Sequence, residues 1–379
     1  MKYGHLERIE MTLRNLAPVF IGSGESLTKK EYIFSPQKQL IYFLDFPKFI
    51  QFMKSRGLLA KFERFLTQPR NNDLRVFLEE NGVGEKDYLT FSSYSIEAGE
   101  AARIPNFREV LTFLKGPDGL PYIPGSSLKG VIRTALLAKL VKTGDWERNR
   151  AEIETEANNY RSSRFYLTRE SNFLEQKAFY KLGITNPRNQ QVLRQPVNDL
   201  MRGIQISDSA PLGWESLTLV GKYDRKPKGD VKALPIFREC LIPGSEANVV
   251  LTLELPLLKK AGIDLDYIED ALHSFANEHY ANFEQYFQEQ PEDAAIAAED
   301  GVDLILGGGA GYVSKTINYN LFPNRTRSLP LVAKILSKQF PKHKHHTDVG
   351  AYKVSPHTLK TTIYQGEAFQ MGRCELIFK

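Results

Sequence analysis

Residues 122–134 read Tyr-Ile-Pro-Gly-Ser-Ser-Leu-Lys-Gly-Val-Ile-Arg-Thr, and the rest of the chain is organised around the helix that they open. Pro124 and Gly125 end the extended segment before it, and we expect a hydroxyl of Ser126 or Ser127 to cap the free N–H groups of the new helix. Apolar residues then recur at helical spacing up to a stop at 142–144. The stretch therefore predicts an amphipathic helix with a well-defined start.

Two cations lie close to the start of this helix. Lys129 and Arg133 are four residues apart, so they share one face near the N-terminal end, where free N–H groups favour an anion such as phosphate. Gly130 costs about 1 kcal/mol relative to alanine inside a helix, which is understandable if another backbone comes close. Taken alone, the stretch fits an ordinary capped helix with two solvated cations equally well.

Length and composition limit the class of protein. The 379 residues, 42% hydrophobic and 25% charged, can bury a sizeable core and suggest two or three domain-sized units. A net charge of +5 permits a polyanionic partner without demonstrating one. Cys240 and Cys374 are far apart, which argues against a disulfide framework or a zinc ribbon. Without a signal peptide or an apolar run of membrane-spanning length, we expect a cytoplasmic protein with no membrane partner.

Two glycine clusters add possible phosphate contacts. Gly22, Ser23 and Gly24 form a sharp loop after the first predicted strand, although such a loop is more often a simple hairpin turn. The second cluster, 307–316, is the densest on the chain, but Ser314 stands where a nucleotide-binding P-loop requires glycine, so we predict no NTPase. The N–H groups of this loop and Lys315 suit a phosphodiester backbone, and a structural turn is the alternative.

The remaining candidates for chemistry are weak. His343, His345 and His346 lie in a basic run for which we favour a solvated loop over a metal site. Residues 161–169 interleave cations with aromatics, as a single-stranded nucleic-acid groove does, but a surface helix edge gives the same pattern. No nucleophile arrangement is visible and no catalytic carboxylate can be singled out. We therefore predict no catalytic residue, no metal ligand and no cofactor.

Four segments together resemble a known family. They are 18–25, 123–133, 307–316 and the C-terminal Thr358-Leu-Lys with Gly372-Arg-Cys-Glu-Leu. In this order they resemble the RAMP superfamily of CRISPR-associated proteins, and the combination is most similar to the fifth Csm subunit of type III-A effector complexes. The resemblance spans the chain, and the Ile-Pro-Gly-Ser-Ser-Leu-Lys-Gly element is its most specific part.

The resemblance implies a non-catalytic RNA-binding subunit that caps the filament at the end holding the 3′ part of the guide RNA. It implies crRNA, a single-stranded RNA, and other Csm RAMP subunits as partners, and a part in crRNA maturation in antiviral defence with cellular nucleases. A RAMP endoribonuclease and a protein-interaction scaffold are the alternatives. The RNA-binding positions carried over are Gly22, Ser23, Gly24, Ser126, Ser127, Lys129, Arg133, Gly308, Gly309, Gly311 and Lys315.

The predicted architecture is α+β, with a ferredoxin-like, RRM-related RAMP core and helical insertions. A strand, helix, strand, strand, helix, strand order can be traced through Leu6, Leu128, Ile204, Val249, Ile268 and Leu376. We predict two fused halves, 1–213 and 214–379, with a glycine-rich loop in the second half and a boundary near Trp214; one dispersed core is the alternative. The chain lacks the aromatic pair with which RRM domains stack bases, which favours backbone-led, sequence-tolerant binding.

Overall fold

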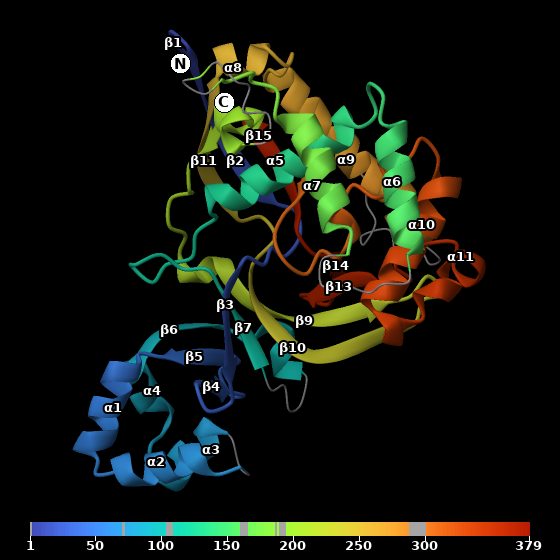
Figure 1. Cartoon of the computed structure of the whole chain (residues 1–379). Coiled ribbons are helices and arrows are strands. Elements are labelled where there is room, and N and C mark those ends of the chain that lie inside the picture. Colours follow the sequence, from blue (N-terminus) through green and yellow to red (C-terminus); the bar gives the residue numbers. More distant parts are fainter. Residues whose placement is uncertain are drawn as a thin grey trace.

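The computed structural model describes residues 2–69, 73–103, 109–159, 166–185, 188, 195–287 and 301–379. Most of the predicted cation–aromatic stretch 161–169 lies outside these residues. Figure 1 shows an upper body that combines a sheet with most of the helices, two long curved strands beneath it, and a separate helical lobe at the lower left.

An antiparallel sheet of six strands forms the upper body. Its strands follow the order β12 (Leu304–Ile305), β15 (Arg373–Phe378), β2 (Leu6–Asn15), β11 (Glu246–Glu254) and β8 (Ile204–Ile206), with β1 (Lys2–Tyr3) folded back on β2. The alternating sequence of β11 turns Ala247, Val249, Leu251 and Leu253 into the core.

Two helices complete this unit. Helix α5 (Gly125–Leu140) and helix α9 (Leu265–Asn282) pack against each other and against β8 and β12 respectively. In chain order the unit reads β2, α5, β8, β11, α9, β15, with β2 between β15 and β11 in the sheet. This is the predicted strand and helix order, and the expectation of an α+β ferredoxin-like core is confirmed. The short helix α8 (Leu255–Lys259) follows β11 directly.

A second, curved sheet joins the body to the lobe. Its strands follow the order β3 (Gly22–Thr28), β7 (Glu109–Phe113), β10 (Val231–Leu241), β9 (Leu217–Arg225), β6 (Ser92–Glu97), β5 (Leu40–Leu44) and β4 (Tyr32–Ser35), while β13 (Leu359–Tyr364) pairs with β9 and with β14 (Glu367–Gln370). Both sheets combine strands from before and after Trp214. The predicted division into units 1–213 and 214–379 and the alternative of one dispersed core both stay predictions.

The helical lobe has an apolar core of its own. Its helices α1 (Phe46–Ser55), α2 (Leu59–Thr67), α3 (Leu74–Glu80) and α4 (Glu85–Phe91) surround one face of the β4–β5 hairpin. The Asp45 carboxylate accepts from the Lys48 N–H at 3.1 Å and so begins α1. Aromatic rings fill the centre, with the Phe49 ring 5.0 Å from that of Phe62 and 5.2 Å from that of Phe91.

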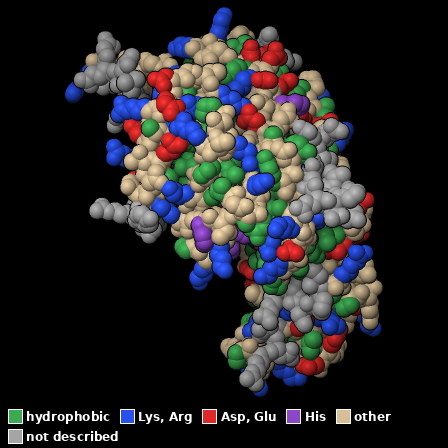
Figure 2. All heavy atoms as spheres, turned by 90° about the vertical axis from the view of Figure 1, so that its right-hand side faces the viewer, with side chains coloured by type: hydrophobic (Ala, Val, Ile, Leu, Met, Phe, Trp, Pro, Cys, Tyr) green, Lys and Arg blue, Asp and Glu red, His purple; other side chains and the backbone are tan. Residues whose placement is uncertain are grey.

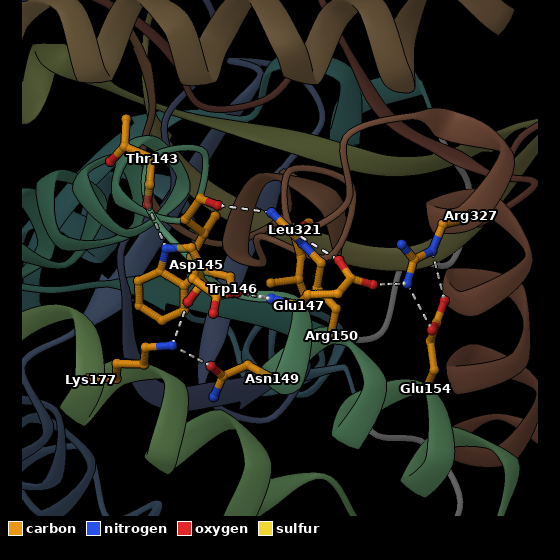
Figure 3. Close-up of polar contacts among 11 residues, drawn as sticks. Thr143, Asp145, Trp146, Glu147, Asn149, Arg150, Glu154, Lys177, Leu321 and Arg327 are labelled. Carbon is orange, nitrogen blue, oxygen red and sulfur yellow. Dashed lines mark hydrogen bonds and ion pairs between the residues drawn. The ribbon is translucent and has the colours of Figure 1, made fainter.

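Polar contacts attach the other inserted helices to the body, as Figure 3 shows. Helices α6 (Glu147–Asn158) and α7 (Thr168–Phe179) follow α5, and α10 (Arg325–Gln339) and the short α11 (Asp348–Ala351) lie beside them (Figure 1). The Arg327 guanidinium on α10 contacts Glu147 at 3.0 Å and Glu154 at 2.9 Å on α6. The insertion after α5 is therefore tied to α10. Among the described residues, no helix combines the length and apolar character needed to span a membrane.

We expect Phe49→Ala to destabilise the helical lobe. The side chain is fully buried, and removing a core phenylalanine costs about 3–5 kcal/mol in transfer energy and cavity formation. Urea unfolding combined with hydrogen exchange should show the loss, with protection falling first in 46–91. Phe46→Ala on the same helix is the control, because that side chain is 52% exposed. Equal destabilisation by the two variants would contradict the separate core.

Candidate nucleic-acid interface

The first and last glycine clusters meet around Phe20. The segment after β2 runs next to the segment after β12, and the Gly308 N–H donates to the Phe20 carbonyl at 2.6 Å. Gly307 has φ +79°, and a Cβ there would lie 2.2 Å from the Phe20 carbonyl oxygen. Only glycine fits at this point. Gly309 also has positive φ, and its Cβ would lie 2.7 Å from the Met371 sulfur.

The Gly22–Gly24 segment is not a hairpin turn. It begins strand β3, which pairs with β7 and carries an irregularity between Gly22 and Ser26. A Cβ built at Gly22 would lie 3.0 Å from the Phe20 ring, so Gly22 packs on this ring. The Ser23 and Thr112 hydroxyls share a 2.6 Å hydrogen bond. Gly24, at φ +92°, is exposed. The structure thus brings two of the three predicted segments together, with open backbone at Gly24.

Three cations from the second sheet surround this meeting point. Arg238 on β10 lies over the Phe20 ring at 5.4 Å, and its guanidinium is 3.5 Å from a Cβ built at Gly309. Lys360 on β13 lies 3.6 Å from a Cβ built at Gly311. Lys222 on β9 is half-buried; burial lowers its pKa, and the neighbouring Lys360 and Arg238 lower it further. We call Lys222, Arg238 and Lys360 the basic cluster.

The charge of the basic cluster is only partly balanced. Asp224 pairs with Lys360 at 2.7 Å. Among the described residues, neither Lys222 nor Arg238 forms an ion pair, and burial lowers the pKa of Arg238. A desolvated cation without a counter-charge is costly, so an anion bound here would be stabilised. No sequence pattern predicted these three residues. An arginine inside the largely apolar run 236–241 was the available signal.

The start of α5 differs from the expected cap. The helix begins at Gly125, and its N–H donates to the Asp208 carboxylate at 2.8 Å, so Ser126 and Ser127 lie inside the first turn and do not cap it. The chain itself therefore supplies the anion that a helix N-terminus favours. A Cβ at Gly125 would lie 2.2 Å from the Ile206 carbonyl oxygen, so a close backbone approach within the chain occurs at Gly125. The approach of another backbone expected at Gly130 stays a prediction.

The two cations near the start of α5 have different surroundings. The Arg133 guanidinium contacts Glu175 and Asp199, each at 2.9 Å, and stacks on the Phe179 ring, so it holds α5 to the inserted segment. Lys129 is partly exposed; burial lowers its pKa, and no ion pair holds it in the described part of the chain. Lys129 is therefore the α5 cation that remains open to a partner. Among the described residues, and apart from the helix's own backbone, no atom lies within 4 Å of a Cβ built at Gly130.

Lys315 lies on a different part of the surface from the basic cluster. It ends a 3-10 turn (Val313–Lys315) and lines a cavity of about 410 Å³ together with Thr134 of α5, Tyr166, Glu175 and Tyr312. The side chain is exposed. The cavity connects the segment after the glycine loop with the middle of α5. RNA contact at this and the other predicted positions stays a prediction.

The expected solvated histidine run is only partly solvated. His343 and His346 are exposed, but His345 is buried against the Asp348 carboxylate. Figure 2 draws the face on the right-hand side of Figure 1 and shows histidine side chains there beside lysine and arginine side chains. The expectation of a wholly solvated loop is therefore wrong for His345, because a carboxylate three residues later and His357 enclose it.

Comparison with known proteins identifies relatives along the whole chain. The model of the RAMP superfamily matches residues 12–312. A Mycobacterium tuberculosis protein named CRISPR system Cms protein Csm5 is 31% identical over 98% of both chains, and its Streptococcus thermophilus namesake is 33% identical over 81% of this chain and 79% of its own.

Two solved structures share the fold. One is a chain from a cryo-EM structure of a Csm-crRNA-target RNA ternary complex of a type III-A CRISPR-Cas system, with a TM-score of 0.62 and 22% identity over 97% of this chain and all of the other. The second is the crystal structure of T. onnurineus Csm5, with a TM-score of 0.63 and 20% identity over 96% and 99% of the two chains.

Replacing two glycines of α5 should have opposite effects. Gly125→Ala forces a Cβ against the Ile206 carbonyl, and we expect a loss of about 1–3 kcal/mol in the free energy of unfolding. Gly130→Ala places a methyl group in open space inside a helix, where alanine is favoured by about 0.5–1 kcal/mol. Urea unfolding of both variants measures the difference. A stabilised Gly125→Ala protein would contradict the close approach at β8.

Proposed function

The chain belongs to the RAMP superfamily and, within it, to the Csm5 proteins; from that premise we propose that it is a non-catalytic RNA-binding subunit of a type III-A Csm effector complex. The observation that carries the proposal is the basic cluster beside Gly309 and Gly311. Cations that lack a full set of carboxylate partners, next to glycines that allow close approach, suit the phosphodiester backbone of RNA. The solved Csm complex that shares the fold is described as containing crRNA and target RNA.

The proposed RNA is the crRNA, held as a single strand near its 3′ end. In this position the subunit caps the filament of Csm RAMP subunits, and it aids crRNA maturation by admitting cellular nucleases. This finer assignment rests on the family resemblance. Gly22 and Ser23 shape β3, and Arg133 positions α5. The residues that we propose to contact RNA are the basic cluster, Gly24, Ser126, Ser127, Lys129, Gly308, Gly309, Gly311 and Lys315.

A RAMP endoribonuclease remains the second candidate. Cleavage of a phosphodiester needs a general base or a metal-bound water close to the 2′-hydroxyl or the phosphate. In the described part of the chain, the carboxylate that forms an ion pair with the basic cluster is that of Asp224, and its contact with Lys360 at 2.7 Å engages it. A scaffold role for the inserted helices, the third candidate, is compatible with RNA binding elsewhere on the chain.

Removing two cations of the basic cluster should weaken RNA binding. We expect the double variant Lys222→Gln, Arg238→Gln to bind a single-stranded RNA at least about tenfold more weakly near 0.15 M salt. The slope of log K against log salt should fall by about 0.7 for each phosphate that the variant no longer neutralises. Neither substitution removes the partner of a carboxylate, and fluorescence anisotropy across a salt series is the measurement.

The matched control carries the same change of charge on the helical lobe. Lys54→Gln with Lys86→Gln removes two exposed cations, and its affinity and salt slope should equal those of the unmodified chain. If both double variants lose affinity equally, the basic cluster is not the RNA site. The comparison also separates specific contacts from a general effect of net charge.

The chain should not turn over RNA. We expect a labelled single-stranded RNA to stay intact when incubated with the purified protein at substoichiometric amounts, with and without Mg²⁺, while the same RNA is retained in a Csm assembly. Mass spectrometry of the assembly reports subunit incorporation. Multiple-turnover cleavage that disappears with the double variant would favour the endoribonuclease.

A further inference from the structure

A cluster of metal-ligand side chains lies where α10, α11 and β13 meet. His345 and Asp348 belong to the segment that ends in α11, and His357 precedes β13. The Nδ1 atom of His345 lies 2.9 Å from one Asp348 oxygen, and the Nδ1 atom of His357 lies 2.6 Å from the other. One ligand atom from each of the three residues lies within 4.8 Å of the other two.

We propose that His345, Asp348 and His357 bind a divalent transition-metal ion, with Zn²⁺ as the best match. Two imidazole nitrogens and one carboxylate oxygen form a ligand set that zinc uses with a fourth position open to water. Ligands held about 2.1 Å from one ion lie about 3.4 Å apart, so the ligand atoms need to move by only about 1 Å. Mg²⁺ and Ca²⁺ prefer oxygen ligands and do not suit a site with two imidazoles.

The surroundings are those of a supported metal site. Asp348 is fully buried, and its carboxylate also accepts a hydrogen bond from the Ser355 hydroxyl at 2.6 Å. Ser355 is held in turn by Tyr319, whose hydroxyl donates to the Ser355 carbonyl at 2.6 Å and accepts from the Ser355 N–H. Such hydrogen bonds from a second layer of residues fix the orientation of a ligating carboxylate. The Tyr352 ring stacks on His357 at 5.2 Å and limits its rotation.

The site would join two segments that have little regular structure between them. Asp348 opens the one-turn helix α11, whereas His357 lies just before β13, which pairs with β9. An ion bound to both would fix the connection from α11 into β13. The proposal does not depend on RNA binding, because none of its ligands belongs to the basic cluster.

The test measures zinc bound to protein from which any affinity tag has been removed. After treatment with a chelator and addition of Zn²⁺, followed by desalting, elemental analysis should find one zinc per unmodified chain. Co²⁺ in place of Zn²⁺ should give the visible absorption bands of a four- or five-coordinate site. His357→Gln and Asp348→Asn should each lose most of the bound zinc.

The matched control is His346→Gln, which changes an exposed histidine next to the site and should keep one zinc per chain. Circular dichroism confirms that each variant is folded. At a zinc concentration about a hundredfold above Kd, the unfolding midpoint of the unmodified chain should rise by about 3 °C, and that of His357→Gln should not change.

Three results would overturn the proposal. The first is an unmodified chain without stoichiometric zinc, in which case the cluster is only a set of hydrogen bonds. The second is zinc retained by His357→Gln and Asp348→Asn at the level of the unmodified chain. The third is an equal loss of zinc in His346→Gln, which would assign the metal to the exposed histidine run.

Discussion

The arrangement of the molecule depends on strand β2 being paired along both edges. It lies between β11 and β15, so the beginning and the end of the chain meet at the centre of one sheet. Because β12 pairs with β15, the segments that follow β2 and β12 leave the sheet close together. The contact between Phe20 and Gly308 is a direct consequence. The glycine cluster is thus positioned by long-range pairing and not by its own sequence.

Two neighbouring charges on β10 show how the fold treats buried ions. Glu239 is fully buried and accepts hydrogen bonds from the Tyr94 hydroxyl, the Phe113 N–H and the Lys115 ammonium, which offset the cost of removing a carboxylate from water. Arg238 points to the opposite face of the strand, where its guanidinium contacts the Phe20 ring and the Met371 sulfur. The fold neutralises the first charge internally, whereas the second forms no ion pair among the described residues.

Periodic patterns predicted the order of strands and helices well, because each pattern depends on residues that are close together in the sequence. The order from Leu6 to Leu376 follows the sequence pattern. Helix α10 escaped prediction because Pro330, an unusual residue inside a helix, interrupts its pattern. The predicted division near Trp214 rests only on the order of segments along the sequence. The sheets, in contrast, are assembled from strands that are distant in sequence.

The candidate site was harder to predict because its determinants are distant in sequence. The cap of α5 comes from Asp208, 83 residues after Gly125, and the carboxylates that engage Arg133 lie 42 and 66 residues away. Local spacing identified the cations of α5 correctly but could not show which of them the chain itself neutralises. The basic cluster could not be predicted from local spacing, because its members come from three strands and share no motif.

The surroundings of Phe20 bear on how RNA would be read. The Arg238 guanidinium lies over its ring, and Gly22 and Gly308 pack against the same ring. A ring enclosed in this way cannot offer a face to a base, whereas Lys222 and the open backbone at Gly24 can meet phosphate. Binding through such groups depends on the sugar–phosphate backbone and is insensitive to base identity. Under the proposed function, a subunit that holds guides of any sequence requires this kind of contact.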